Sequence, residues 1–162
     1  MSTLTEVSGV NYAHDLEAPP AMVPAQQRYG RVRHLYDSYV LATGDNFGTS
    51  GLINLMKIPK GARVIGGHCY SPSLGTTGIF DIGWAASAEL DSSGVALEAA
   101  DADGLFVSQD AGGQAVDNDM SGAVAGWQKT FAAEVQVQAD FSEASDGSGS
   151  RTISVCLLIV VD

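Results

Sequence analysis

Two short acidic runs in the second half of the chain carry the side chains best suited to bind a cation. Asp101 and Asp103 belong to the run "DADG", and Asp117 and Asp119 belong to the run "DND". Carboxylate oxygens suit Ca²⁺, but neither run continues into the twelve-residue loop with a terminal Glu that calcium-binding hands use. Calcium binding is therefore the minor alternative, and we expect no metal and no other cofactor.

Histidine and cysteine are the remaining ligands and nucleophiles. His14, His34 and His68 lack the paired spacing of metal ligands, and the neighbours His68 and Cys69 would point to opposite faces of a strand. Cys69 and Cys156 lie in two predicted strands far apart in the sequence. We interpret them as buried reduced thiols rather than a disulfide, since a cytoplasmic product keeps its thiols reduced.

Motifs for catalysis are missing from the sequence. It contains no "GxSxG", no "HExxH" and no evident Ser, His and Asp set, and its Gly-rich runs "LGTTG" and "GTSG" lack the Lys of a phosphate loop. The sequence therefore predicts a protein that is not an enzyme. Trp84 and Trp127 could stack on a sugar ring, although a tryptophan in a small sandwich more often belongs to the core.

Charge divides the chain into two unequal halves. Residues 1–80 hold six basic and five acidic groups, whereas residues 81–162 hold two basic and fourteen acidic groups, a net charge of −12. An acidic body repels phosphates, so we expect no binding to nucleic acid. The sequence has neither a long apolar run nor the start of a signal peptide, and we expect a soluble protein, made in the cytoplasm, with no membrane partner.

The elements that position these groups read as strands and turns. Glycine is frequent, at 19 of 162 residues, and one domain accounts for this length. Pro19, Pro20 and Pro24 exclude a helix or central strand from residues 1–30, which we predict to be an extended N-terminal arm. Residues 31–162 should form an all-β domain, an antiparallel β-sandwich that is jelly-roll-like. Its expected strands are "RVRHLYDSYVLA", "LINLMKI", "ARVIGGHCY", "TGIFDIGWAA", "WQKTFAAEVQVQADF" and "RTISVCLLIVVD".

Several details follow from the pattern within these strands. Phe80, Ile82 and Trp84 alternate with other residues and should share one buried face. The pair Gly66 and Gly67 suggests a bulge or a close approach of another backbone. The final strand is apolar on both faces and should be central. A short helix is expected near residues 95–109, with Asp101 or Asp103 as its cap.

The run "LMKIPKGARVIGGHCYSPSLGTTGIFDIGW", followed by "DADGLF" and a closing apolar strand, resembles small virion structural proteins of tailed bacteriophages. The resemblance covers residues 50–110 and, more loosely, the last strand. It implies a component of the phage particle, a head decoration or cement protein on the outer surface of the capsid. It carries over no catalytic residue. A sugar-binding or tail-associated sandwich is the alternative.

The charge pattern suggests how such a protein would hold its shell. Arg28, Arg31 and Arg33 follow the arm directly, and Tyr29 lies among them. We expect these four residues to contact carboxylates of the major capsid protein, with the acidic body toward solvent. Decoration proteins gather around symmetry axes, so we also expect a homo-oligomer, most simply a trimer.

Overall fold

Eight strands make up the regular structure of the chain. The computed structural model describes residues 31–41, 51–142 and 150–161, and the bounds of its strands in chain order are β1 (Arg31–Leu41), β2 (Leu52–Ile58), β3 (Arg63–Ser71), β4 (Ile79–Trp84), β5 (Asp101–Asp110), β6 (Val116–Asp119), β7 (Val135–Phe141) and β8 (Arg151–Val161). Gly and Pro punctuate the connections between the first four strands, as in "PKGA" between β2 and β3.

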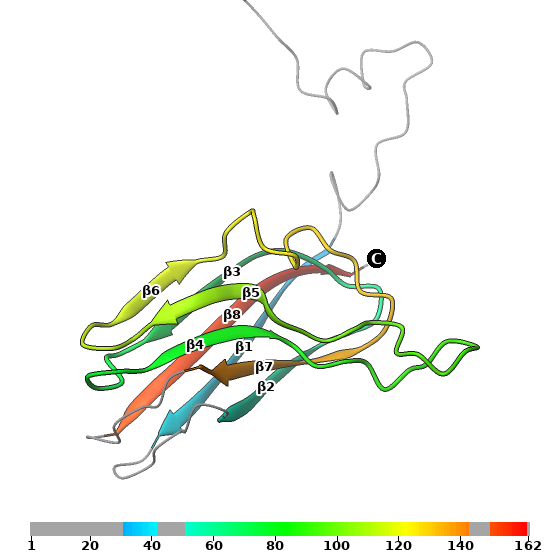
Figure 1. Ribbon diagram of the computed structural model, residues 1–162. Helices are drawn as coiled ribbons and strands as arrows, with labels where there is room; N and C mark the ends of the chain where they lie inside the picture. The colour runs from blue at the N-terminus through cyan, green and yellow to red at the C-terminus, as the bar shows by residue number, and fades with distance from the viewer. Residues whose placement is uncertain (1–30, 42–50, 143–149, 162) are drawn as a thin grey trace, which may run out of the picture.

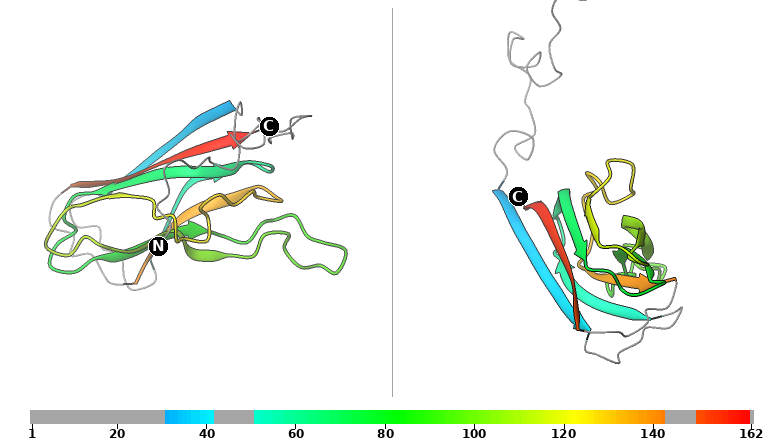
Figure 2. Two further views of the ribbon diagram at one scale, coloured as in Figure 1. Left: turned by 90° about the horizontal axis from the view of Figure 1, so that it is seen from above. Right: turned by 90° about the vertical axis from the view of Figure 1, so that its left-hand side faces the viewer.

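The strands form two four-stranded antiparallel sheets that face each other (Figures 1 and 2). One sheet has the order β1-β8-β3-β6 and the other has the order β2-β7-β4-β5. Among the described strands, β4 and β5 are consecutive in sequence and paired in one sheet, whereas every other pair of consecutive strands lies in different sheets, as in a double Greek key. The expected all-β, jelly-roll-like sandwich is confirmed.

A single apolar core fills the space between the layers. Along β7 and β8 every second side chain is buried, because the inner face of each strand packs on the opposite sheet. Phe80, Phe131 and Phe141 are fully buried, and the rings of Phe80 and Phe141 lie 5.5 Å apart. The last strand, β8, lies between β1 and β3, so its predicted central place is confirmed.

The predicted features of β3 and β4 are also present. Phe80, Ile82 and Trp84 are buried on one face of β4. The register between β3 and β8 shifts between Val64 and Gly66, which is the predicted irregularity. At Gly67 an added Cβ would meet Leu157 Cδ2 at 2.8 Å and the Cys156 carbonyl oxygen at 3.0 Å, so the neighbouring strand does approach closely.

The region between β4 and β7 differs from the sequence prediction. The short helix expected near residues 95–109 is wrong, because β5 occupies 101–110 and the described residues contain no helix. The strand β6 was not expected, and β7 begins at Val135 rather than at Trp127. Residues 121–134 instead form turns that cross the end of the sandwich and donate hydrogen bonds to β3, as in Gln128 N to the Val64 carbonyl at 2.9 Å.

The predicted N-terminal arm, residues 1–30, lies outside the described residues, so the division into an arm and a domain stays a prediction. No helix in the described part of the chain has the length and apolar character needed to cross a bilayer.

Candidate functional site

The outer face of the β1-β8-β3-β6 sheet carries a row of uncovered apolar side chains. Ile153, Val155, Leu157 and Ile159 of β8 point into the core, so the residues between them and their partners in register point outward. The term outer face is used here for five of these residues: Val32, Tyr36 and Val40 of β1, Leu158 of β8 and Tyr70 of β3. The three residues of β1 are 58%, 60% and 56% exposed.

Strand β1 is itself an open edge. In the described structure it pairs with β8 alone, over all eleven of its residues, and only Leu41 of the eleven is buried. A long edge strand presents unpaired N–H and C=O groups along its free side, and proteins normally shield such edges. An uncovered apolar face beside an uncovered edge is typical of a surface that meets another protein.

Two histidines are fixed on the same face by partners on neighbouring strands. His34 Nε2 and Cys156 Sγ are hydrogen-bonded at 2.8 Å, which joins β1 to β8. His68 lies 2.9 Å from Asp117 Oδ1 and 3.0 Å from Asp119 Oδ1, which joins β3 to β6. These contacts use the imidazole nitrogens to tie strands together.

The structure places only part of the predicted capsid-contact set. Arg28 and Tyr29 lie outside the described residues. Arg31 and Arg33 lie on β1 and are exposed, but their register partners Val161 and Ile159 place them on the side of the strand opposite Val32 and Tyr36. Their contact with a shell protein is not tested by this structure and stays a proposal.

The two cysteines lie on adjacent strands but on opposite faces. Cys69 is paired with Val155 and is fully buried in the core, whereas Cys156 is paired with His68 and faces outward, half-buried. Burial raises the pKa of the Cys69 thiol to about 12. Both thiols are free, and the predicted burial is complete for Cys69 and partial for Cys156.

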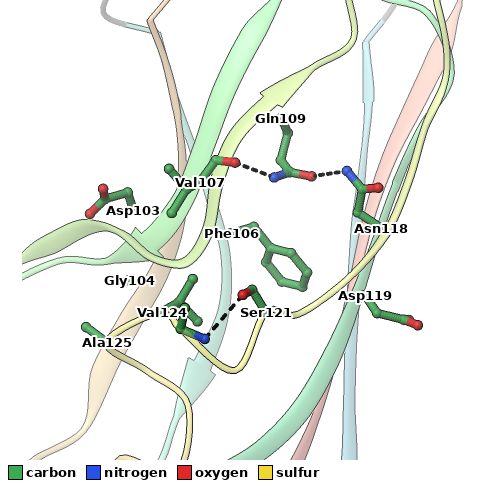
Figure 3. A pocket seen from close by; sticks show the side chains of 11 residues that line it. Asp103, Gly104, Phe106, Val107, Gln109, Asn118, Asp119, Ser121, Val124 and Ala125 are labelled. Atoms are coloured by element: carbon green, nitrogen blue, oxygen red, sulfur yellow. Dashed lines mark hydrogen bonds between the residues drawn. The ribbon is translucent and has the colours of Figure 1, made fainter.

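A second feature is a pocket of about 490 Å³ at the opposite edge of the sandwich, between β5 and β6 (Figure 3). The side chain of Phe106 forms its floor, and Ser121, Ala123, Val124 and Ala125 form one wall. At one end the Asn118 amide donates to Gln109 Oε1 at 2.8 Å, and Gln109 Nε2 donates to the Val107 carbonyl at 2.7 Å. Gln109 is 6% exposed, so this chain of bonds holds Asn118 in place.

The two acidic runs of the sequence meet at this pocket. Asp103 of "DADG" and Asn118 with Asp119 of "DND" all line it. Within the described residues, however, no three His, Cys, Asp or Glu side chains are arranged to hold a metal ion. Burial, a side-chain hydrogen bond that protonated Asp101 donates to Asp103, and the Asp103 charge together raise the pKa of Asp101.

The two tryptophans have different surroundings. Trp84 is 4% exposed, its Nε1 donates to the Ala99 carbonyl at 2.9 Å, and its ring packs edge-on against Phe131, so Trp84 belongs to the core. Trp127 is 37% exposed on the turns after β6, but it does not line the pocket. The sequence analysis proposed tryptophans as the sugar-binding groups and did not predict the pocket, whose residues come from β5, β6 and the turns between β6 and β7.

Comparison with known proteins places the fold. No family model matches the sequence, and no curated protein matches it. Two solved structures contain chains that are similar in fold. The chain in "Cyanophage Pam1 capsid asymmetric unit" aligns with a TM-score of 0.59 and 15% identity, over 88% of this chain and 99% of that chain. The chain in "Capsid of Ralstonia phage GP4" aligns with a TM-score of 0.62 and 18% identity, over 88% of this chain and 92% of that chain.

These alignments span nearly the whole of each capsid chain. Each neighbour is therefore a chain built around this one sandwich, and not a larger protein that contains it as a part. The chain described here has the fold of these phage capsid components.

Proposed function

We propose that the protein is a structural component of a bacteriophage particle, with no enzymatic activity, that binds the outer surface of the head as a decoration or cement protein. The observation that carries this proposal is the fold, which is shared over almost the whole length of separate chains in two phage capsids. The sequence motifs between residues 50 and 110 support the same assignment independently. The protein would be made in the host cytoplasm and reside in the virion.

The charge distribution favours the outside of the shell. Residues 81–162 carry a net charge of −12, and this half of the chain supplies most of β4 and all of β5 to β8. The phosphates of packaged DNA inside a head would repel such a body. At separations below the Debye length, about 8–10 Å at physiological ionic strength, salt screens this repulsion only in part. An acidic surface also keeps a protein soluble when many copies accumulate.

The partner in this proposal is the major capsid protein, and β1 supplies the contact. Val32, Tyr36 and Val40 offer apolar area on the outer face, while Arg31 and Arg33, on the other side of this edge strand, offer charge-assisted hydrogen bonds to carboxylates of the shell. Arg28 and Tyr29 directly precede this strand and would extend the same contact. Buried aromatic and Arg side chains are the residues that dominate most interfaces.

Copies of the protein would associate on the shell, and a trimer around a symmetry axis is the state we favour. Sedimentation of the purified protein at tens of micromolar is the check. A stable trimer supports self-association, whereas a monomer at every concentration leaves the shell as the only template for assembly and removes the trimer from the proposal.

The proposal is tested on the particle itself. Mass spectrometry of purified phage should find this chain in many copies, and a reagent that cannot enter the head should label it on intact particles. Separately, changing Arg28, Arg31 and Arg33 to Ala should weaken binding to heads that lack the protein. Absence from the particle, or labelling only after the head is opened, would contradict the proposed function.

A further inference from the structure

The pocket between β5 and β6 is a built site at the open edge of the sandwich. Both strands are edge strands, one in each sheet, and the turns at residues 121–125 close the gap between them (Figures 1 and 3). The volume of about 490 Å³ lies within the roughly 300–1,000 Å³ typical of small-molecule sites. It is separated from β1 by two strands of the same sheet, β8 and β3.

Two exposed polar groups of the pocket, on Asn118 and Ser121, are neutral and oriented. Asn118 lies opposite Cys69 in the β3–β6 register, on the same side of the sheet as that buried thiol. One N–H of the Asn118 amide donates to Gln109 Oε1. The other N–H and the carbonyl oxygen of Asn118 can therefore bond a ligand. Ser121 Oγ accepts from Ala123 N at 3.2 Å, so its own proton remains to donate.

Apolar surface surrounds these groups. Phe106 and Val107 of β5 and Val124 of the facing turns line the same space. A ligand must therefore combine hydroxyl or amide groups with C–H faces, because bare apolar ligands would strip the amides of hydrogen bonds at a cost of about 1–3 kcal/mol each.

The charges at the rim exclude other classes. None of the eleven described lining residues is basic, so a phosphate, sulfate or carboxylate would have no cation to meet. Asp119 lies at the rim and is engaged by His68 at 3.0 Å. Asp103, the other carboxylate, can accept hydrogen bonds from hydroxyl groups and would repel anions.

We propose that this pocket binds a neutral saccharide, with Asn118, Ser121 and Asp103 bonding its hydroxyls and Phe106, Val107 and Val124 facing its C–H surface. This inference goes beyond the proposed function and does not depend on it. On an assembled particle that uses β1 toward the shell, the pocket would lie at the far edge of the sheet and stay open. Many copies on one particle would then raise a weak affinity for a glycan-bearing surface through multivalency.

The experiment is an amide NMR titration of the full chain with neutral sugars, namely glucose, galactose, mannose, N-acetylglucosamine and their common disaccharides, at millimolar concentration. At least one sugar should shift the resonances of Gly104, Ser121, Ala123 and Ala125. Its sialylated or sulfated derivative should bind more weakly. Lysine and putrescine serve as cationic probes and should produce no such shifts.

Two variants locate the site. Asn118→Ala should weaken binding by on the order of tenfold, the loss of about one good hydrogen bond. Since that change also strips Gln109 of its partner, Ala123→Trp provides a second test that fills the pocket and leaves the amide pair intact. The matched controls are Asn54→Ala, which removes an amide on β2, and Ala88→Trp, at an exposed alanine in the loop between β4 and β5.

The possible outcomes separate clearly. Loss of binding in both pocket variants, with both controls unchanged, supports the proposal. It is overturned if no neutral sugar shifts the pocket resonances, if the shifts centre on Trp127 instead, or if the cationic probes bind in place of the sugars. Equal binding by a folded Ala123→Trp variant would overturn it as well.

Discussion

Lys129 Nζ lies 2.8 Å from Glu98 Oε2, and this ion pair ties the turns before β7 to the loop before β5. The Glu98 side chain is only 8% exposed, and its second oxygen accepts from Ala132 N at 2.6 Å. The ammonium group also lies 5.3 Å from the centre of the Phe131 ring. A carboxylate buried in this way depends on its cation, because an unpaired charge is costly inside a protein.

Removing the cation should therefore destabilise the fold. We expect Lys129→Ala to lower the free energy of unfolding by about 2–3 kcal/mol, less than the roughly 3–5 kcal/mol of a fully buried pair because the Lys129 side chain is 30% exposed. The matched control is Lys57→Ala, which breaks an ion pair of similar length, 2.7 Å to Glu134, whose side chains are 61% and 52% exposed. That change should cost about 0–1 kcal/mol. Urea denaturation measures both, and equal losses would show that burial does not set the difference.

Adjacent glycines on β3 should respond differently to the same substitution. Gly67→Ala places a methyl group 3.0 Å from the Cys156 carbonyl oxygen and 2.8 Å from Leu157 Cδ2, and it should cost about 1–3 kcal/mol through overpacking. Gly66→Ala meets Leu158 Cδ1 at an ordinary 3.8 Å and should cost much less. Thermal unfolding of both variants is the measurement. A Gly66 variant as unstable as the Gly67 variant would contradict the close approach described for Gly67.

The raised pKa of Asp101 makes a prediction about pH. Burial and the neighbouring Asp103 favour the protonated carboxyl in the folded state, so ionisation of Asp101 costs stability above its folded pKa. Asp101→Asn should therefore be more stable than the parent at pH 7. The advantage should shrink as the pH falls toward the unfolded pKa of about 3.9, because both states then carry the proton. Denaturation midpoints measured from the unfolded pKa of about 3.9 up to neutral pH test the trend.

Asp91 provides the control of opposite sign. Hydrogen bonds from Ser93 Oγ, at 2.7 Å, and from the Val95 and Ser93 amides lower its pKa. The ionised form thus contributes stability that is present above the unfolded pKa and is lost as the pH falls through the lower, folded pKa. Asp91→Asn should reduce stability at pH 7 and show a smaller effect in acid. The same pH trend in both variants would rule out these assignments.

The two thiols should differ in reactivity. Cys69 is fully buried with a pKa of about 12, whereas Cys156 is half-buried, with a pKa that burial also raises. Since the thiolate is the reactive form, iodoacetamide should modify Cys156 slowly and Cys69 only after unfolding. Peptide mass spectrometry with and without urea distinguishes the sites. A Cys69–Cys156 disulfide in the native protein would contradict the opposite-face arrangement.

The strands with a regular pattern could be predicted from the sequence, and those without one could not. The run "LINLMKI" corresponds to β2 residue for residue, and the two-sided apolar run of β8 indicated a central strand. In β5 the pattern of alternation is broken, because Leu105 and Phe106 are both buried and Ser108 has a φ of 48°. Two register shifts against β4 accompany this irregularity. Without a regular alternation, residues 95–109 were predicted to form a short helix.

The candidate surfaces divide in the same way. The acidic runs at 101–104 and 117–119 were recognised in the sequence, but their meeting at one pocket follows from the pairing of distant strands, which local patterns do not encode. The uncovered outer face was also missed. Val32, Tyr36 and Val40 were interpreted only as β-strand residues, and their exposure depends on β1 being an edge that pairs with β8 alone in the described structure.

The most direct test of the central claim is the occupancy of phage heads that lack this protein after incubation with purified variants, measured by gel densitometry of sedimented particles. Changing Val32, Tyr36 and Val40 to Ser removes apolar area that is already exposed, so the variant should fold. The matched control is Leu52→Ser, an exposed apolar residue on the other sheet. We predict that the control saturates heads like the parent and that the triple variant binds at least about tenfold more weakly. Equal saturation by a folded triple variant would contradict the assignment of β1 as the shell-binding strand.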